Sequence, residues 1–215
     1  GGRRLQRHWQ WGGAWVSRIL GRYVNEKGKY TGLYFGTKSH FSDQQKAGIA
    51  ANIAKFPADV AAVSGRPATD FNAFSLSEVP EGAKGAFDRI IVMRMLHNMM
   101  NWNIADSEIK AMRDLLKDDG LLGIEQHRAK ADAPFSYTNG TKGYMREADI
   151  IKFMEVNGFE LVAKSEINAN PKDSANWPDG VWTLPPALRL KDVDRAKYEA
   201  IGETDRMTLL FKKRP

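Results

Sequence analysis

The sequence predicts an α/β protein built on a doubly wound, mostly parallel sheet with helices on both faces. Helix-like and strand-like segments alternate along the 215 residues, which is the pattern of that fold class. The apolar runs are short and rich in β-branched residues, as is typical of strands buried on both faces of a parallel sheet. Polar residues directly follow two of these runs, at the edge where open α/β sheets bind their ligands.

The central stretch of the chain carries the clearest pattern. Residues 87–94 predict a buried strand, and apolar residues at helical spacing predict a helix over residues 106–117. Asp119 and Gly120 provide a helix stop, and residues 121–125 predict the next strand. The polar ends of the two strands are therefore expected to point toward one site.

Turn residues and apolar spacing predict the remaining elements in order. A late strand following a long insertion completes the pattern, and the loop over residues 129–143 is read either as a flap or as plain surface. Before the central stretch we expect a helix from Trp15, a strand over 28–36, a helix over 42–55, a strand over 59–63 and a loop over 69–85. After it we expect a helix over 146–157, a strand over 159–167, a Trp/Pro-rich segment, a helix over 193–201 and a strand over 207–211.

Two histidines are the candidate catalytic residues. His97 follows the first central strand and His127 follows the second. Histidine is the natural general base near neutral pH, although a histidine at a strand end often only caps a loop. No His-x-His or His-x-x-x-His spacing occurs, so no metal site is expected.

Polar neighbours of the histidines are candidate substrate contacts. Arginines suit an anionic substrate, but those near the histidines could equally pair with Glu125 or Asp88. Further along, two asparagines stand where the Trp/Pro-rich segment leaves its strand, and that segment would either cap the substrate or pack as a rigid excursion. The candidates for substrate binding are Arg94, Asn98, Arg128, Asn168 and Asn170.

A glycine turn before the first helix is the candidate cofactor loop. Gly12 and Gly13 precede apolar residues at helical spacing, an arrangement that lets backbone N–H groups approach a nucleotide-like ligand, although such turns are often only structural. The second predicted strand ends at Phe35 and Gly36, where nucleotide-binding units usually place an acidic residue.

Composition bounds the partners. A net charge of +6 would suit a polyanion, but the basic residues are scattered among 26 acidic ones, so nucleic acid is not the expected partner. The absence of cysteine excludes disulfides and thiolate metal sites. No apolar run approaches the roughly 18 residues of a membrane span, so no membrane segment is expected.

Several motifs together resemble a known family. The most specific ones run through residues 164–171 and 177–186, and the similarity covers nearly everything from Gly12 onward. The chain resembles class I S-adenosylmethionine-dependent methyltransferases, and among them a bacterial family of predicted methyltransferases with a Pro-Gly-Gly-Gly-Trp-Tyr cofactor loop. The other motifs lie at residues 12–16, 94–98, 125–129 and 143–147.

The resemblance implies a Rossmann-like methyltransferase fold in a single domain, residues 1–215, with an antiparallel last strand beside the fifth and an insertion over residues 168–206. It implies methyl transfer from S-adenosylmethionine to an unidentified small-molecule acceptor. It leaves open a homodimer, and a cytoplasmic or, as in relatives with export signals, periplasmic location. The cofactor-binding residues it implies are Gly12, Gly13, Ala14, Trp15, Phe35 and Gly36.

Other functions remain open at this point. His8 and Trp11 stand where the family has an acidic residue and a small one, so the chain could keep the fold as a non-catalytic binding protein. A basic nucleic-acid methyltransferase is a further alternative, although Pro185 and Pro186 follow Leu184 and do not form the Asn/Asp-Pro-Pro-Tyr/Phe motif. A dehydrogenase is disfavoured because no Gly-x-Gly-x-x-Gly occurs.

Overall fold

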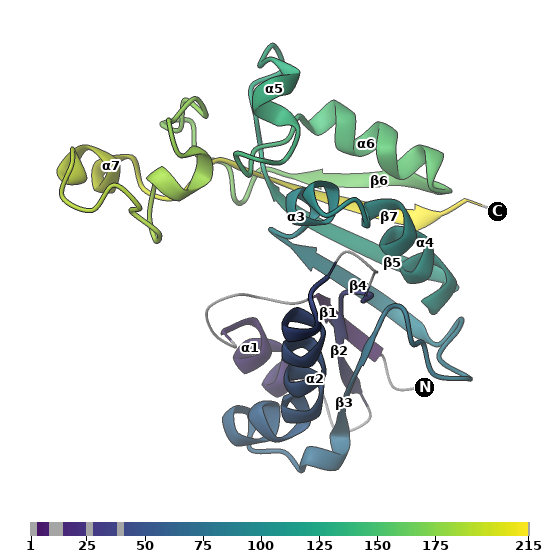
Figure 1. Ribbon diagram of the computed structural model, residues 1–215. Helices are drawn as coiled ribbons and strands as arrows, with labels where there is room; N and C mark the ends of the chain where they lie inside the picture. The colour runs from purple at the N-terminus through teal and green to yellow at the C-terminus, as the bar shows by residue number, and fades with distance from the viewer. Residues whose placement is uncertain (1–3, 9–14, 25–27, 38–40, 215) are drawn as a thin grey trace. The chain divides into compact units, whose positions relative to one another are not determined.

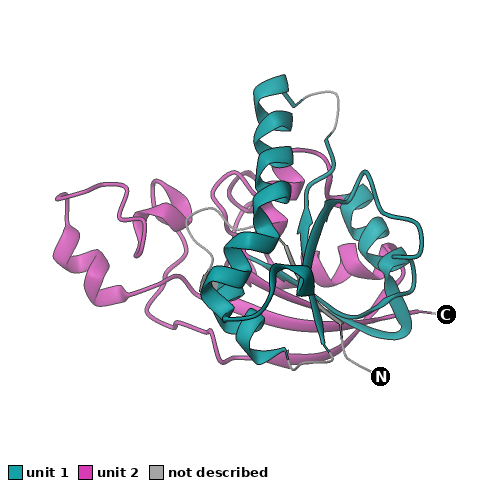
Figure 2. Cartoon of the chain, turned by 90° about the horizontal axis from the view of Figure 1, so that it is seen from below, with its two compact units in different colours: residues 1–93, 106–122, 215 teal, residues 94–105, 123–214 magenta. Residues whose placement is uncertain are grey.

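The computed structural model describes residues 4–8, 15–24, 28–37 and 41–214 and has the predicted mixed α/β character (Figure 1). The chain divides into two compact units (Figure 2). Unit 1 comprises residues 1–93, 106–122 and 215, and unit 2 comprises residues 94–105 and 123–214. Each unit is described by itself below, and the single domain over residues 1–215 stays a prediction.

The strands follow the order β3-β2-β1-β4-β5-β7-β6. Strand β1 pairs in parallel with β2 and β4, and β2 pairs in parallel with β3. Strand β7 pairs antiparallel with β6, so the last strand has the predicted direction relative to its neighbour. The bounds are β1 Arg4–His8, β2 Lys29–Tyr34, β3 Phe71–Ser75, β4 Phe87–Met93, β5 Leu116–His127, β6 Phe159–Ser165 and β7 Arg206–Lys213.

Unit 1 packs helix α2 (Asp43–Ser64) against strands β2 and β3 (Figure 1). Tyr30 and Tyr34 project from the same face of β2 into a core with Phe56 of α2. Gly32 lies between them, and a Cβ there would stand 2.8 Å from the Phe56 ring, so the glycine leaves room for the ring against the strand. The other helices that lie wholly or mainly in this unit are α1 Trp15–Tyr23, η1 Ala68–Asp70 and α4 Ala105–Leu115.

The predicted strand over residues 59–63 is wrong. Helix α2 continues through Pro57 to Ser64 and ends at Gly65, which has the left-handed conformation of a C-cap. Phe56 and Val60 are buried in the core while Ala58 between them is exposed, a four-residue spacing that fits one face of a helix and not the two-residue alternation of a strand. The β-branched content of the short run was therefore outweighed by packing of the helix on the sheet.

Two further boundaries differ from the prediction. Strand β3 lies inside the segment expected to be a loop over residues 69–85, and its pairing with β2 places Phe71 opposite Tyr30. Strand β5 already begins at Leu116, although Asp119 and Gly120 were predicted to end a helix. Leu116 is fully buried while Asp119 is exposed, so the strand holds its charges in solvent.

Unit 2 contains the C-terminal half of β5 and the β6–β7 pair. The predicted helix over 146–157, the strand over 159–167, the helix over 193–201 and the last strand over 207–211 are all present with boundaries shifted by up to two residues. The predicted loop over residues 129–143 includes a short helix and is tied to the insertion, since Val181 N donates to Lys142 O at 3.0 Å and Tyr137 Oη donates to Trp177 O at 3.0 Å. The helices are α3 Leu96–Asn101, α5 Phe135–Thr138, α6 Glu147–Val156, η2 Gly180–Thr183 and α7 Arg195–Ile201.

None of the helices in the described part of the chain is long and apolar enough to cross a membrane.

Candidate functional site

The two predicted histidines lie together in unit 2. His97 comes from helix α3 and His127 ends strand β5, and their ring centroids are 5.7 Å apart. Trp182 meets His97 edge-on at 6.0 Å and Tyr144 meets His127 at 6.3 Å. These four residues, His97, His127, Tyr144 and Trp182, form what we call the histidine cluster. The structure thus brings the two candidate bases together, and their catalytic role stays a prediction.

Burial keeps His97 neutral. The side chain is 3% exposed, and burial lowers its pKa to about 4, against which the hydrogen bond with Gln126 acts in part. Gln126 itself is fully buried, with Nε2 at 3.1 Å from His97 Nδ1 and donating to Gly143 O at 2.7 Å. Gln126 therefore fixes the imidazole plane. Sequence reasoning did not single it out, and its only signal was its place next to His127.

His127 is also neutral. Burial lowers its pKa well below the usual value, and repulsion from a protonated His97 and from Arg94 and Arg206 acts in the same direction. Thr204 Oγ1 lies 2.6 Å from His127 Nδ1 and orients the ring. Two neutral imidazoles near pH 7 can each accept a proton from an O–H or N–H group. Thr204 was not identified from the sequence, because it is distant in the chain and carries no motif.

Arg94 pairs with Glu125, one of the two carboxylates that the sequence analysis named as possible partners. Its Nε lies 3.9 Å from Glu125 Oε2, and its backbone N–H donates to Glu125 O at 2.7 Å. Arg206 Nε lies 2.5 Å from the other carboxylate oxygen of Glu125. Burial raises the pKa of Glu125, and the two arginines oppose that rise. The ion pairs place the Arg94 charge against a buried carboxylate.

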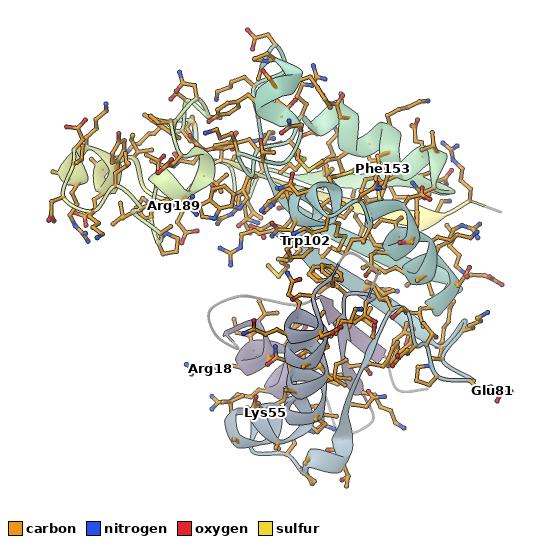
Figure 3. The ribbon with its side chains drawn as sticks, viewed as in Figure 1. Arg18, Lys55, Glu81, Trp102, Phe153 and Arg189 are labelled. Atoms are coloured by element: carbon orange, nitrogen blue, oxygen red, sulfur yellow. The ribbon has the colours of Figure 1, made fainter. Side chains whose placement is uncertain are left out.

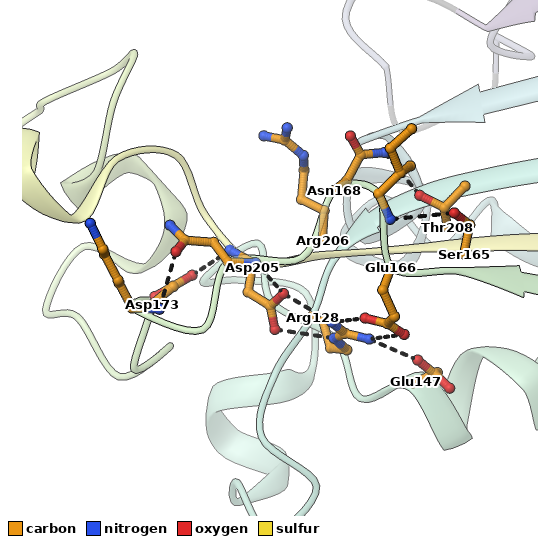
Figure 4. A network of polar contacts seen from close by, with 12 residues as sticks. Arg128, Glu147, Ser165, Glu166, Asn168, Asp173, Asp205, Arg206 and Thr208 are labelled. Carbon is orange, nitrogen blue, oxygen red and sulfur yellow. Dashed lines mark hydrogen bonds and ion pairs between the residues drawn. The ribbon is translucent and has the colours of Figure 1, made fainter.

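Arg128 is the centre of a network of carboxylates (Figure 4). Its Nε and Nη2 donate to Asp205 at 3.1 and 3.0 Å, and its Nη1 and Nη2 donate to Glu166 at 3.0 and 2.7 Å. Nη1 also donates to Glu147 at 3.3 Å. The hydrogen bonds that Arg128 donates to Glu166 and Asp205 raise its pKa. A guanidinium has five N–H donors, and these bonds use all of them, so a substrate anion would have to displace a carboxylate. The predicted substrate contact of Arg128 stays a prediction.

Asn168 and Asn170 form hydrogen bonds at the two ends of the insertion. Asn168 Nδ2 donates to Thr208 Oγ1 at 2.9 Å, and Asn170 Nδ2 donates to Ile201 O at 2.9 Å. Both amides thereby fasten the ends of the segment between β6 and β7. Asn98 makes a weak contact, with Nδ2 at 3.7 Å from Met95 Sδ. Of the three predicted asparagines, Asn98 thus has the weakest side-chain hydrogen bond.

Asp173 is a buried residue that sequence reasoning missed. It is fully buried and accepts from the Tyr144 hydroxyl at 2.8 Å and from Trp177 Nε1 at 2.7 Å. It also accepts from the backbone N–H groups of Asp205 and Ala175, each at 2.8 Å. Four hydrogen bonds compensate the buried charge and join the insertion to the histidine cluster through Tyr144.

The predicted cofactor residues belong to unit 1 and are described only in part. Gly12, Gly13 and Ala14 lie outside the described residues, while helix α1 begins at Trp15 as predicted. At the end of β2, Phe35 is buried and Gly36 N donates to Glu108 Oε1 at 2.9 Å. The carboxylate of Glu108 of α4 thus lies at the end of β2, where the sequence itself places no acid. A Cβ at Gly36 would stand 2.9 Å from Glu108 Oε1, so a larger residue there would displace the carboxylate.

Within residues 4–8, 15–24, 28–37 and 41–214, no group of three or more His, Asp or Glu side chains is arranged to hold a metal ion.

No family model and no curated protein matches the chain. Solved structures do. The [4+2]-cyclase SpnF is 18% identical with a TM-score of 0.56 over 100% of this chain and 75% of its own. A SAM-dependent methyltransferase from Methanosarcina mazei is 11% identical with a TM-score of 0.54 over 99% of this chain and 93% of its own. The 1,6-didemethyltoxoflavin-N1-methyltransferase of Burkholderia thailandensis, with bound S-adenosylhomocysteine, is 11% identical with a TM-score of 0.50 over 100% and 72%. At these identities the likeness shows the fold, which this chain shares with S-adenosylmethionine-dependent methyltransferases.

Proposed function

We propose that this chain transfers a methyl group from S-adenosylmethionine to a small-molecule acceptor. The observation that carries the proposal is the similarity of fold over essentially the whole chain to S-adenosylmethionine-dependent methyltransferases, one of them with S-adenosylhomocysteine bound. The pair of buried neutral imidazoles adds to it, since an O–H or N–H acceptor must lose a proton during methylation.

The residues of this chain would divide the work by chemistry. S-adenosylmethionine supplies an electrophilic methyl group when bound. His97 and His127 are the groups that would take up the proton of the acceptor, because each carries an unprotonated ring nitrogen at neutral pH. Gln126 and Thr204 would hold the two rings in place through their Nδ1 atoms. Displacement at a methyl carbon needs close alignment, which fixed rings favour.

The cofactor-binding residues form a separate part of the proposal. The predicted residues Gly12, Gly13, Ala14 and Trp15 would contribute backbone N–H groups at the start of helix α1. Gly36 has no side chain to obstruct a ligand at the end of β2. Glu108 stands at the end of β2, where an acid suits ribose hydroxyls.

A thermal-shift titration with S-adenosylmethionine and S-adenosylhomocysteine, confirmed by calorimetry, tests the proposal. A ligand at about a hundred times its dissociation constant adds about 2.7 kcal/mol, which raises the melting temperature of a chain of this size by about 5–10 °C. An equimolar mixture of adenosine and methionine is the matched control and should give no comparable shift. An unchanged melting temperature at millimolar S-adenosylmethionine and S-adenosylhomocysteine would contradict the proposal.

A non-methylating activity is the second candidate. The similarity to SpnF, a [4+2]-cyclase, favours it, because the fold then serves reactions other than methyl transfer. Binding of S-adenosylhomocysteine without transfer of label from methyl-labelled S-adenosylmethionine to any compound of an acceptor library would favour this candidate. Label in a small-molecule product would decide for methyl transfer.

A further inference from the structure

Arg189 contacts the histidine cluster through Trp182. The residue lies in the insertion after η2 (Figure 3), and its guanidinium carbon is 4.6 Å from the centroid of the Trp182 ring. Its backbone N–H donates to Trp182 O at 2.9 Å, so both the backbone and the side chain of Arg189 contact Trp182. Trp182 in turn meets His97 edge-on at 6.0 Å. A cation thus rests on the ring that contacts one of the two neutral imidazoles.

Arg189 differs from the other arginines of this region in its partners. The five donors of Arg128 are bonded to carboxylates, and Arg94 and Arg206 both face Glu125. Across the described part of the chain, by contrast, the Arg189 guanidinium has no hydrogen bond and no carboxylate within ion-pair distance, and its charge interaction there is with the Trp182 ring. Its donors remain directed to solvent.

The segment that carries Trp182 is fixed to the rest of unit 2. Gly180 has a φ of 59°, and a Cβ there would stand 2.1 Å from Lys142 O, so the chain crosses the 129–143 loop in close contact. Val181 N donates to Lys142 O at 3.0 Å, and Leu184 is fully buried. Backbone hydrogen bonds and packing therefore fix the Trp182 ring on which Arg189 lies. This reduces the conformational entropy lost when the guanidinium of Arg189 binds a ligand.

We infer that Arg189 binds an oxyanion of the acceptor, so that the acceptor is a small molecule carrying a carboxylate or a phosphate. This deepens the proposed function and rests on it. A planar guanidinium binds both groups through paired N–H donors, and stacking on an aromatic ring holds its plane. The neutral imidazoles supply no positive charge, so an anionic acceptor beside them requires a cation. Among the four arginines compared above, Arg189 is the one whose guanidinium has no carboxylate partner within the described residues.

Ligand-observed NMR with a matched probe set tests the inference. The probes are 4-hydroxybenzoate, phenyl phosphate and the neutral methyl 4-hydroxybenzoate, each titrated to 10 mM on wild type, Arg189→Ala, Arg189→Lys and Arg195→Ala. Arg195 is the matched control, because it is an arginine of unit 2 that pairs with Glu199 at 2.8 Å on helix α7.

We expect Arg189→Ala to weaken binding of at least one anionic probe by about tenfold or more, as loss of a charge-assisted paired bond should. Arg189→Lys should retain part of the affinity, and Arg195→Ala should retain all of it. Binding of 4-hydroxybenzoate alone identifies a carboxylate site, and binding of phenyl phosphate alone identifies a phosphate site. The inference is overturned if neither anion binds wild type, if the neutral ester binds as tightly as the anions, or if Arg189→Ala leaves anion affinity within twofold.

The probes require neither cofactor nor turnover, so failure of this inference is distinct from failure of the proposed function. If S-adenosylmethionine shifts the melting temperature but anion binding is independent of Arg189, the inference alone fails. If anion binding depends on Arg189 but S-adenosylmethionine and S-adenosylhomocysteine do not bind, the methyltransferase proposal fails and Arg189 remains an anion site.

Discussion

Thr204 Oγ1 lies 2.6 Å from Nδ1 of His127, and both side chains are buried. Thr204 precedes strand β7, whereas His127 ends β5, so the contact exists only in the folded unit. The hydroxyl determines how the imidazole is turned and which ring nitrogen is left for chemistry. Thr204 is thus a positioning residue for one of the two candidate bases.

Thr204→Val should release the His127 ring. The substitution keeps the volume but removes the hydroxyl, so we expect a loss of about 1–3 kcal/mol in the free energy of unfolding. The nitrogen chemical shifts of His127 should also change, because the tautomer is no longer fixed, and Thr204→Ser should restore the wild-type shifts. Unchanged nitrogen shifts in Thr204→Val would show that the hydroxyl does not position the ring.

Acid should destabilise the protein through His97. Below its ordinary pKa of 6.5 the unfolded chain binds a proton that the folded chain binds only near pH 4, so the free energy of unfolding falls as the pH drops from 7 toward 4. For this group the loss between pH 7 and pH 5 is about 2 kcal/mol. Denaturant titrations across this range should give a smaller pH slope for His97→Gln than for wild type. An equal slope would mean that His97 titrates normally in the folded protein.

Arg128→Ala should destabilise unit 2 rather than remove a substrate contact. The substitution leaves the carboxylate of Asp205, whose side chain is 10% exposed, without its cation, at a cost of about 2–4 kcal/mol. Arg195→Ala removes an exposed pair with Glu199 and should cost less than about 0.5 kcal/mol. Chemical denaturation of both variants measures the difference. If the two costs were equal, the network around Arg128 would contribute little to stability.

Two glycine substitutions should have opposite effects. Gly180→Ala places a Cβ 2.1 Å from Lys142 O at a positive φ and should lower the free energy of unfolding by more than about 2 kcal/mol. Gly48→Ala lies in helix α2 with nothing within 4 Å of the new Cβ, and it should raise stability by about 0.5–1 kcal/mol. Thermal melts of the two variants should therefore move in opposite directions from wild type. A stable Gly180→Ala would show that the segment carrying Trp182 can shift.

Periodicity located most elements but failed where packing overrode it. The helix over 146–157 and the strand after it were readable because their apolar residues repeat at one period and turn residues bound them. The run over residues 59–63 suits a strand by composition, yet it is helical because Val60 packs beside Phe56 in the core. Short apolar runs carry too little periodicity to decide between the two.

From the sequence alone, the mixed α/β class and the placement of His97 and His127 after neighbouring strands could be predicted, whereas the direction of the last strand was implied by the family resemblance. The histidines could be placed because strand ends in such sheets collect at one edge, which is a property of chain order. Which charged side chains are free to bind a ligand could be read only from the folded chain. There, all donors of Arg128 are bonded to carboxylates, Glu108 accepts from Gly36 N, and the Arg189 guanidinium lies over the Trp182 ring. Such pairings join residues far apart in the chain, and their energies depend on distance and burial that no local pattern encodes.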